Sequence, residues 1–415
     1  MRVGEVRHPE RARWGKPLAG VRILAIEQMQ ALPYATQLMS HLGADVVKVE
    51  HPRTGESGRG ARPSLVDEDG RQVGATYLRN NLGKRSIGID LKQPQGRALL
   101  LRLVPHFDVV GENFKAGTMQ RLGLSYETLS ALHPGLVLVS VTGFGSSSAS
   151  PYASWPAYAP IAEAMAGLYE QNRRGDEAPT PLVAGALGDI GSAMFAVIGT
   201  LAALRHRERT GLGQHVDVAM YDAMVAVADM VPFMWSMGAV QAQKGGGGFG
   251  IIEAFRARDG WFVLEVIREH QFERLAHTIG CAEWCDDPRF ADRADWDAHK
   301  ESVLRPAIEA WARDLSKLEA CRRLCENGVA AGPSNTAEDL HADPHVRDRD
   351  MLIEVPRPDS ERPLLVVGNP VKLSRVAEGP VARFPRLGQH TDALLRELLE
   401  IEDEELARLH ECGAI

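Results

Sequence analysis

The hydrophobic and polar positions of residues 21–50 follow three successive patterns. The run VRILAIE after Gly20 is almost continuously apolar, which is typical of a strand buried on both faces of a sheet. The segment LPYATQLMSHLG then repeats apolar residues with a helical period, has Pro33 near its first turn and stops at Gly43. ADVVKVE is a second apolar run. These patterns predict a strand–helix–strand unit with a right-handed crossover.

The same alternation continues through the next hundred residues. KRSIGIDL, DVVGENF and GLVLVSVTGF predict strands, whereas PQGRALLLRLVPHF and SYETLSALH predict helices that start at Pro94 and Ser125. The fold class is therefore α/β, with an open, mostly parallel, Rossmann-like sheet. The glycine fingerprint of an NAD site is missing, because QMQALP follows the first strand, so we do not expect a nicotinamide enzyme.

The second half of the chain predicts a long helix followed by a smaller domain. The helix starts near Ile190 and ends at Gly211, and two apolar runs around Asp259-Gly260 predict a hairpin. A chain of 415 residues exceeds what one hydrophobic core normally supports. We expect a large Rossmann-like domain in residues 1–225, a smaller α+β domain in residues 226–340, and a C-terminal return to the large domain in residues 341–415.

Overall composition narrows the class of protein. The net charge of −8 argues against nucleic acid or an anionic membrane as the main partner. The first twenty residues contain no apolar segment of a signal peptide or anchor. No window reaches the roughly 18 uninterrupted apolar residues that a spanning helix needs. We therefore expect a cytoplasmic protein whose ligands are small molecules.

The five cysteines raise the question of a metal site. They form two CxxxC pairs, Cys281/Cys285 and Cys321/Cys325, and a separate Cys412. A four-residue step can place two thiolates on one helix face, but it does not match the CxxC spacing of common zinc sites. We predict buried, reduced thiols and no metal site.

Four segments in the order of the chain carry a resemblance to a known family. They are PLAGVRILAIEQMQALPYATQLMSHLGADVVKVEHPRTGESGRG, GKRSIGIDLKQPQGRALL, DVVGENFKAGTMQRLGLSYETLSALHPGLVLVSVTGFG and TGLGQHVDVAMYDA. Together they make residues 18–265 similar to the class III coenzyme A transferases, the family of formyl-CoA transferase. PRLGQHTDALLREL continues the likeness near the end, whereas residues 280–360 match it only faintly.

The resemblance implies an acyl-CoA:carboxylate CoA transferase. In this family a side-chain carboxylate attacks the acyl-CoA thioester, and an anhydride and then an aspartyl-CoA thioester form on the enzyme. It also implies an interlocked homodimer, acyl-CoA and a carboxylic acid as small-molecule substrates, and no metal or permanently bound cofactor.

Asp189, in AGALGDIGSAMF, is the residue that matches the family's nucleophile. From its position alone, directly before the long helix, it reads as an ordinary helix N-cap. The small residues around it leave room for a substrate, and we expect the helix start to hold its carboxylate ionised. Asp189 is therefore either the nucleophile or an ordinary N-cap, and both interpretations stay open here.

Tyr158 bears on a related activity. The similar α-methylacyl-CoA racemases have a His at this position, and Tyr is a poor base at neutral pH, which argues against racemisation. Tyr158 is either a substrate contact or a half-buried aromatic at the sheet edge. Ala159 replaces the acidic residue that usually follows. Glu163, one turn later, is either its replacement at the substrate or a solvated surface residue.

The resemblance assigns further residues by motif. Gln30 matches a glutamine beside the nucleophile, where its amide could stabilise an oxyanion. Gly246 and Gly247, in KGGGGFG, match a loop that folds over the nucleophile, although composition alone is typical of a linker. The residues expected near coenzyme A are Arg53, Lys84, Arg85, Asn113, Phe114 and Arg121. The alternatives to CoA transfer are an acyl-CoA racemase or isomerase and a CoA-binding protein without activity.

Overall fold

The structure, a computed structural model, describes residues 1–415 except 147–148, 172, 174–175, 183–184, 239–249 and 358–359. The chain divides into two compact units. The first unit comprises Met1–Leu168, Pro181–Asp229 and Pro344–Ile415, and the second comprises Tyr169–Thr180 and Met230–Asp343. The domain boundaries that we expected at residues 226 and 341 stay a prediction.

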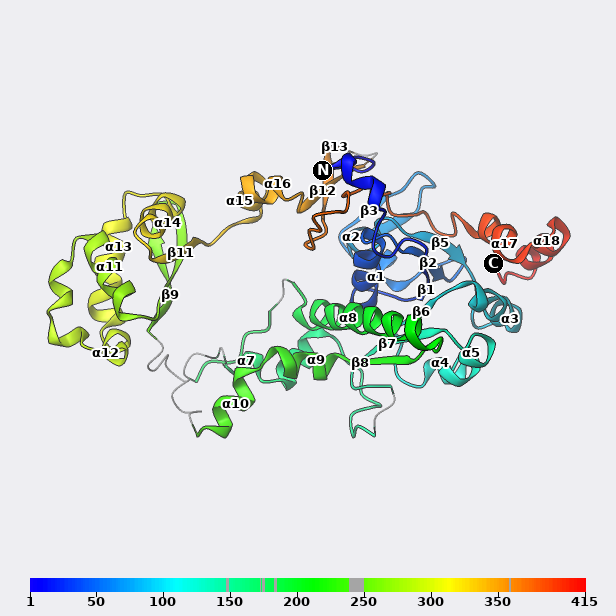
Figure 1. The fold of residues 1–415 in the computed structure, drawn as a ribbon, viewed down its shortest axis with the longest axis horizontal. Coiled ribbons are helices and arrows are strands. Elements are labelled where there is room, and N and C mark those ends of the chain that lie inside the picture. Colours follow the sequence, from blue (N-terminus) through cyan, green and yellow to red (C-terminus); the bar gives the residue numbers. More distant parts are fainter. Residues whose placement is uncertain (147–148, 172, 174–175, 183–184, 239–249, 358–359) are drawn as a thin grey trace. The chain divides into compact units, whose positions relative to one another are not determined.

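A parallel sheet of six strands forms the centre of the first unit (Figure 1). Its strands are β1 (Arg22–Ile26), β2 (Asp45–Glu50), β5 (Arg85–Gly88), β6 (Val109–Glu112), β7 (Val137–Thr142) and β8 (His215–Ala219). The spatial order is β5-β2-β1-β6-β7-β8, and every neighbouring pair is parallel. The chain thus builds outward from β1 in one direction and then from β6 in the other. The predicted open parallel α/β sheet is confirmed.

Helices cover both faces of this sheet. The helices and 3-10 turns of the first unit are η1 (Pro9–Trp14), α1 (Ala31–His41), η2 (Ser57–Gly60), α2 (Ala75–Asn80), α3 (Pro94–Leu103), η3 (Val104–His106), α4 (Thr118–Arg121), α5 (Tyr126–Leu132), α6 (Ala159–Met165), α8 (Leu187–Thr210), α9 (Met220–Val227), α16 (Pro344–Asp348), α17 (Thr391–Leu399) and α18 (Asp403–Glu411). Helices α1 and α8 contact each other and the sheet. Side chains of α3, α5, α17 and α18 share one apolar core with the strands. Such burial on both faces explains why the strands are almost entirely apolar.

The C-terminal helices lie beside the first sheet although they are far from it in sequence (Figure 1). The Thr391 hydroxyl accepts a hydrogen bond from the Gly88 N–H at 2.9 Å, and the Asp90 N–H donates to the Ala414 carbonyl at 2.8 Å. Helix α17 ends where Glu400 adopts a left-handed conformation with φ 51°, and α18 follows.

Two small antiparallel sheets complete the first unit. They pair β3 (Ser64–Val66) with β4 (Gln72–Gly74), and β12 (Leu352–Arg357) with β13 (Ser360–Val367). Their buried residues pack with Tyr77 and Leu82 in a separate apolar cluster. The segment around α2 is therefore anchored by residues from both ends of the chain.

The second unit is a small α+β assembly. Its elements are α10 (Met230–Ser236), β9 (Ile251–Ala257), β10 (Gly260–Val266), α11 (Glu269–Ile279), η5 (Ala282–Cys285), η6 (Pro288–Phe290), α12 (Arg293–Ala298), the π-helix η7 (Lys300–Leu304), α13 (Arg305–Ala312), α14 (Lys317–Glu326), β11 (Ala330–Pro333) and α15 (Ala337–Ala342); α7 (Leu168–Gln171) spans the border of the two units. The hairpin predicted around Asp259-Gly260 is confirmed as β9 and β10. Phe272 stacks on Trp296 at 4.5 Å in its core.

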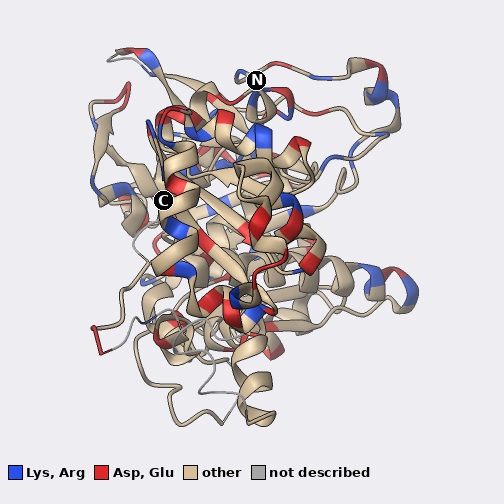
Figure 2. Cartoon of the chain, turned by 90° about the vertical axis from the view of Figure 1, so that its left-hand side faces the viewer, with Lys and Arg blue, Asp and Glu red and all other residues tan. Residues whose placement is uncertain are grey.

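Charged residues of both signs are interspersed over the chain in the view of Figure 2. Some of these charges are buried in pairs that involve Glu50, the last residue of β2, and Glu27, which directly follows β1. The Arg59 side chain bonds Glu50 at 2.6 Å, and Lys84 bonds Glu27 at 2.7 Å. A buried charge is tolerated because its partner and further hydrogen bonds replace the lost water.

Helix α8 has one buried and one exposed apolar side. Among the described residues it is the one helix long and apolar enough to cross a membrane by length and composition, and 44% of its apolar window is buried within the chain. Gly188, Gly191 and Ala193 are on the buried side. Met194, Phe195, Ile198 and Leu201 are 37–61% exposed.

The prediction of buried thiols holds for one cysteine. Cys321 is buried in α14, Cys281 is partly buried, and Cys285, Cys325 and Cys412 are exposed. The prediction of burial is wrong for the exposed cysteines, because their segments are amphipathic and these thiols lie on the side that faces solvent. The described residues contain no group of three or more His, Cys, Asp or Glu side chains placed to hold a metal ion.

Candidate active site

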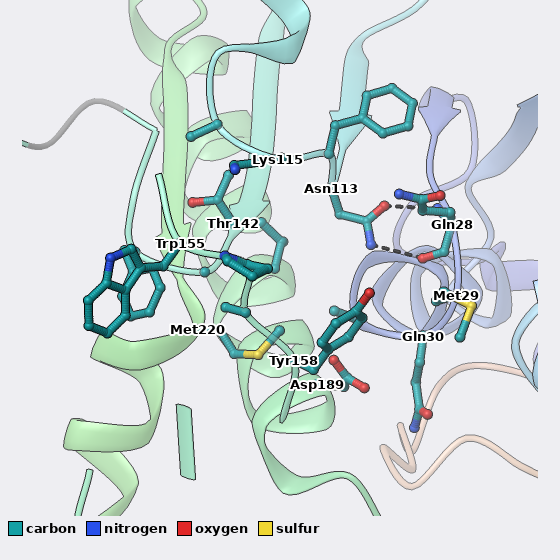
Figure 3. A pocket seen from close by; sticks show the side chains of 18 of the residues that line it. Gln28, Met29, Gln30, Asn113, Lys115, Thr142, Trp155, Tyr158, Asp189 and Met220 are labelled. Carbon is teal, nitrogen blue, oxygen red and sulfur yellow. Dashed lines mark hydrogen bonds between the residues drawn. The ribbon is translucent and has the colours of Figure 1, made fainter. Parts of the chain in front are cut away.

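A cavity of about 430 Å³ opens at the carboxyl ends of the central strands, within the first unit. Its wall includes Gln28, Met29 and Gln30 after β1, Asn113, Phe114 and Lys115 after β6, Thr142 at the end of β7, Thr76 and Arg79 of α2, Tyr158 before α6, Asp189 of α8 and Met220 of α9. Figure 3 shows Asp189, Tyr158 and Gln30 close together at one end of this cavity.

The topology explains the position of the cavity. β1 and β6 are neighbours, but the chain leaves them in opposite directions along the sheet. The loops after them therefore diverge and leave a crevice at the carboxyl edge, where open α/β sheets bind ligands.

Asp189 is inside helix α8 and not at its N-cap. The helix begins at Leu187, and the N-cap is Ala186, whose φ is 38° and whose side chain can make no cap hydrogen bond. The N-cap interpretation is therefore wrong. Asp189 is instead the third helical residue, and it lines the cavity.

The electrostatic environment of Asp189 also differs from our expectation. Burial raises its pKa from 3.8 to about 6, the nearby Glu163 carboxylate adds to the rise, and Arg79 acts in the opposite direction. The loss of water and the like charge thus outweigh the helix start, which we expected to hold the carboxylate ionised.

Glu163 is fully buried, so the interpretation as a solvated surface residue is wrong. Its Oε1 accepts the Gly188 N–H at 2.8 Å. This N–H belongs to the first turn of α8, whose amides have no partner within their own helix. Glu163 therefore caps α8 from α6, one residue before Asp189. It is not among the described residues that line the cavity.

Ala159 packs against the start of the same helix. It is 2% exposed, and a Cβ built on Gly188 would lie 2.8 Å from the Ala159 Cα. The two helices approach so closely that only glycine fits at residue 188. Tyr158 is 69% exposed and lines the cavity, so the half-buried interpretation of this ring is wrong.

The loop after β1 is held by side chains from two other segments. The Gln28 N–H donates to Asn113 Oδ1 at 2.8 Å, and Asn113 Nδ2 donates back to the Gln28 carbonyl at 2.9 Å (Figure 3). Met29 adopts a left-handed φ of 61°, and its N–H donates to Glu56 at 3.0 Å. This conformation turns the chain so that Gln30, the N-cap residue of α1, lies at the cavity.

The Gln30 amide is fixed in one orientation by its partner. Arg79 Nη2 donates to Gln30 Oε1 at 2.8 Å. Because arginine can only donate, the oxygen of the amide faces Arg79 and the NH₂ group is left to donate elsewhere. Gln30 is 6% exposed, so a hydrogen bond from this NH₂ group would form largely out of water.

The residues expected near coenzyme A separate into two groups. Asn113 and Phe114 line the cavity. Arg53, Lys84, Arg85 and Arg121 do not. The Lys84 ammonium is buried and donates to Glu27, the Pro33 carbonyl and Asn81, and burial lowers its pKa to about 8.

The arginines of the second group have different surroundings. Arg85 pairs with Asp45 and, at 3.0 Å, with Glu397. Arg121 is exposed and bonds Thr118 at 2.8 Å. Arg53 has its side chain near Gly413. Gly246 and Gly247, expected to form a loop over the nucleophile, lie outside the described residues.

The sequence patterns missed two cations of the cavity, Arg79 and Lys115. Lys115 follows Phe114 directly at the end of a predicted strand, which was a usable signal. Arg79 is on α2, a six-residue helix between short strands that has no clear apolar period. No local pattern indicated that it would reach this cavity.

Comparison with known proteins places the chain in a family. Residues 18–391 match the model of CoA-transferase family III. Succinyl-CoA:mesaconate CoA-transferase of Haloarcula hispanica is 35% identical over 92% of this chain and 96% of its own. Succinate–glutarate CoA-transferase of Agrobacterium fabrum is 35% identical over 93% of this chain and 96% of its own. A crystal structure of a CAIB/BAIF family protein from Brucella suis is 32% identical over 92% of this chain and 99% of its own, with a TM-score of 0.78.

The match extends over nearly the whole chain and includes both units, and the structural neighbour shares the fold at the same coverage. The chain therefore belongs to CoA-transferase family III.

Proposed function

We propose that this CoA transferase moves coenzyme A from an acyl-CoA thioester to a free carboxylic acid, with Asp189 as the nucleophile. The observation that carries the proposal is the Asp189 carboxylate, which lines the cavity at the carboxyl edge of the sheet with the oriented Gln30 amide in the same wall. The relatives named for mesaconate and glutarate support dicarboxylic acids as the substrate class.

In the first half of the reaction, the acyl group leaves coenzyme A and coenzyme A joins the enzyme. The Asp189 carboxylate attacks the thioester carbonyl, the C–S bond breaks, and the products are a mixed anhydride and the CoA thiolate. The thiolate then attacks the aspartyl carbonyl of the anhydride. The C–O bond breaks, the donor acid leaves as its carboxylate, and Asp189 carries a thioester to coenzyme A.

The second half reverses these steps with another acid. The acceptor carboxylate attacks the aspartyl thioester and expels the CoA thiolate. The thiolate attacks the acyl carbonyl derived from the acceptor, which forms the new acyl-CoA and returns the Asp189 carboxylate. No net proton is gained or lost, so the chain needs a nucleophile and oxyanion donors but no general base.

The surroundings of Asp189 suit this role. A carboxylate with a pKa of about 6 is mostly ionised at neutral pH, and it is more basic than an exposed aspartate. The Gln30 NH₂ group is the donor that we assign to the developing oxyanion. Asn113, Phe114 and Lys115 would contact coenzyme A where it enters the cavity, and Arg53 and Arg121 are exposed cations for its phosphates.

Trapping of the covalent intermediate tests the mechanism. Enzyme incubated with succinyl-CoA and then borohydride or hydroxylamine should carry a modification that peptide mass spectrometry maps to Asp189. Asp189→Asn keeps the shape of the side chain and should give neither the modification nor transfer. Full transfer by this variant, or a modification at another residue, would show that the nucleophile is assigned wrongly.

The two alternative activities give different results in the same assays. Deuterium from the solvent at the α-carbon, without any acceptor acid, would indicate a racemase or isomerase. Tight binding of acyl-CoA in calorimetry with no turnover across a panel of acids would indicate a binding protein.

We also propose that a second copy of the chain covers the exposed side of α8. Met194, Phe195, Ile198 and Leu201 follow the spacing of one helix face, and Ile198 is 61% exposed. Ile198→Asp should convert a dimer to a monomer in sedimentation velocity. Leu132→Asp, at a 47% exposed leucine of α5, is the matched control and should leave the dimer intact. A monomeric wild-type protein would exclude the proposal, and binding to lipid vesicles would indicate a membrane contact instead.

A further inference from the structure

Helix α2 carries Arg79, which lines the cavity, and the helix itself is held by contacts on its buried side. Thr76 and Arg79 are one turn apart on the same side of the helix, and both line the cavity. Tyr77 and Asn80, at 0% and 2% exposure, form its buried side. The helix therefore has an inner side that packs and an outer side directed at the cavity.

Contacts on the buried side fix the position of this helix. The Tyr77 hydroxyl donates to the Pro385 carbonyl at 3.1 Å and accepts a hydrogen bond from buried Arg59 at 2.6 Å. A Cβ at Gly74, the residue before the helix, would lie 2.3 Å from the Ala61 carbonyl oxygen. The start of α2 is thus pressed against the backbone of the preceding segment.

The end of α2 is tied to α1, the helix that Gln30 precedes. Gln37 Nε2 donates to the Arg79 carbonyl at 3.1 Å, and Gln37 Oε1 accepts the Leu82 N–H at 2.7 Å. The backbone of Arg79 is therefore held at a set position relative to Gln30. A guanidinium on such a support is preorganised for a ligand.

The charge of Arg79 is not balanced by an ion pair within the described part of the chain. Its side chain is exposed, and its hydrogen bond goes to the neutral amide of Gln30. Arg59 and Arg85, which are near it in sequence, each pair with a carboxylate. Among the described residues that line the cavity, the one carboxylate is Asp189, which interacts with Arg79 electrostatically but not as an ion pair.

We propose that Arg79 binds the second carboxylate of a dicarboxylic acid whose first carboxylate reacts at Asp189. The planar guanidinium offers parallel N–H donors that match a carboxylate. Because one nitrogen of Arg79 holds Gln30, whose NH₂ group is assigned to the reacting carbonyl, the two ends of one small acid can meet Gln30 and Arg79 together. The assignment rests on the proposed CoA transfer and specifies its substrate class.

Arg79 could instead serve only to orient Gln30, and the test separates these roles. With succinyl-CoA as the donor, kcat/KM is measured for glutarate and for valerate, two acceptors of equal carbon number that differ in the second carboxylate. Loss of Gln30 orientation affects both acids equally and cancels in their ratio. We expect the wild-type enzyme to prefer glutarate by about 100-fold or more, and Arg79→Met to reduce this preference at least about tenfold.

Lys115→Met is the matched control for a general effect of positive charge. Among the described residues that line the cavity, Lys115 is the other exposed cation, and it lies in the loop after β6. We expect this variant to raise KM for succinyl-CoA and to leave the preference for glutarate within about twofold of wild type. An equal drop in preference in both variants would overturn the assignment of Arg79.

A binding measurement gives a second readout that does not depend on turnover. In the Asp189→Asn background, calorimetry compares succinyl-CoA with butyryl-CoA. Arg79→Met should weaken binding of succinyl-CoA at least about tenfold more than binding of butyryl-CoA, because loss of Gln30 orientation affects both thioesters alike. Equal effects on both thioesters, or a wild-type enzyme without preference for glutarate, would overturn the assignment. Absence of transfer to any acid would overturn the proposed function itself, and the assignment with it.

Discussion

Replacement of Asp189 by Asn should make the protein more stable at neutral pH while it removes the proposed nucleophile. The folded protein keeps this carboxyl in a partly buried position near the Glu163 carboxylate, and its pKa is raised from 3.8 to about 6. A group whose pKa is raised on folding favours its neutral form in the folded state. The charged form therefore destabilises the fold at every pH above the unfolded pKa, and the effect is complete above the folded pKa.

The magnitude follows from the size of the pKa change. A rise of about 2 pH units corresponds to about 3 kcal/mol at about 1.4 kcal/mol per unit. Asparagine is neutral at every pH and has nearly the same shape. The variant should thus exceed wild type in free energy of unfolding by about 1.5 kcal/mol at pH 5 and by about 3 kcal/mol at pH 8.

Urea unfolding followed by circular dichroism at pH 5, 6, 7 and 8 measures this difference. Asp229→Asn, at an exposed aspartate of the same unit, is the matched control, and it should change stability by no more than about 0.5 kcal/mol at any of these pH values. A gain for Asp189→Asn that does not grow with pH, or a loss of stability at pH 8, would refute the electrostatic reasoning.

Three further variants probe other parts of the structure. Glu163→Gln keeps an acceptor for the helix cap but removes the charge beside the nucleophile. The fall of kcat/KM on the acid side, expected near pH 6, should therefore move to lower pH. An unchanged pH profile would contradict this expectation. Arg59→Met leaves the buried Glu50 carboxylate unpaired and should cost about 3–5 kcal/mol in urea unfolding, part of which Glu50→Gln should restore. Joint replacement of Gly246 and Gly247 by Ala should lower turnover about tenfold with an unchanged melting temperature, whereas a passive linker would tolerate the change.

Local patterns were sufficient for the elements of the large sheet. Continuous apolar runs mark strands that are buried on both faces, and the caps are equally local, as at Ser125, whose hydroxyl accepts the Thr128 N–H. Gly211, with φ 76°, ends the long helix where the sequence predicted. These signals depend on residues a few positions apart, so they can be read without knowledge of the fold.

The neighbourhood of the candidate nucleophile was decided by tertiary structure. Glu163 looks like a surface residue in its own helix, yet the approach of α6 to α8 buries it against Gly188. Lys84 looks like a free cation, yet three segments supply its acceptors.

The sequence by itself therefore determined the α/β architecture and the family. Local periodicity predicted the architecture, and the order of the motifs indicated the family. Only the tertiary structure showed that the pKa of Asp189 is raised and that Arg79 lines the same cavity. Burial and electrostatic interaction depend on distances between groups far apart in the chain, and the packing of separate helices on one sheet sets those distances.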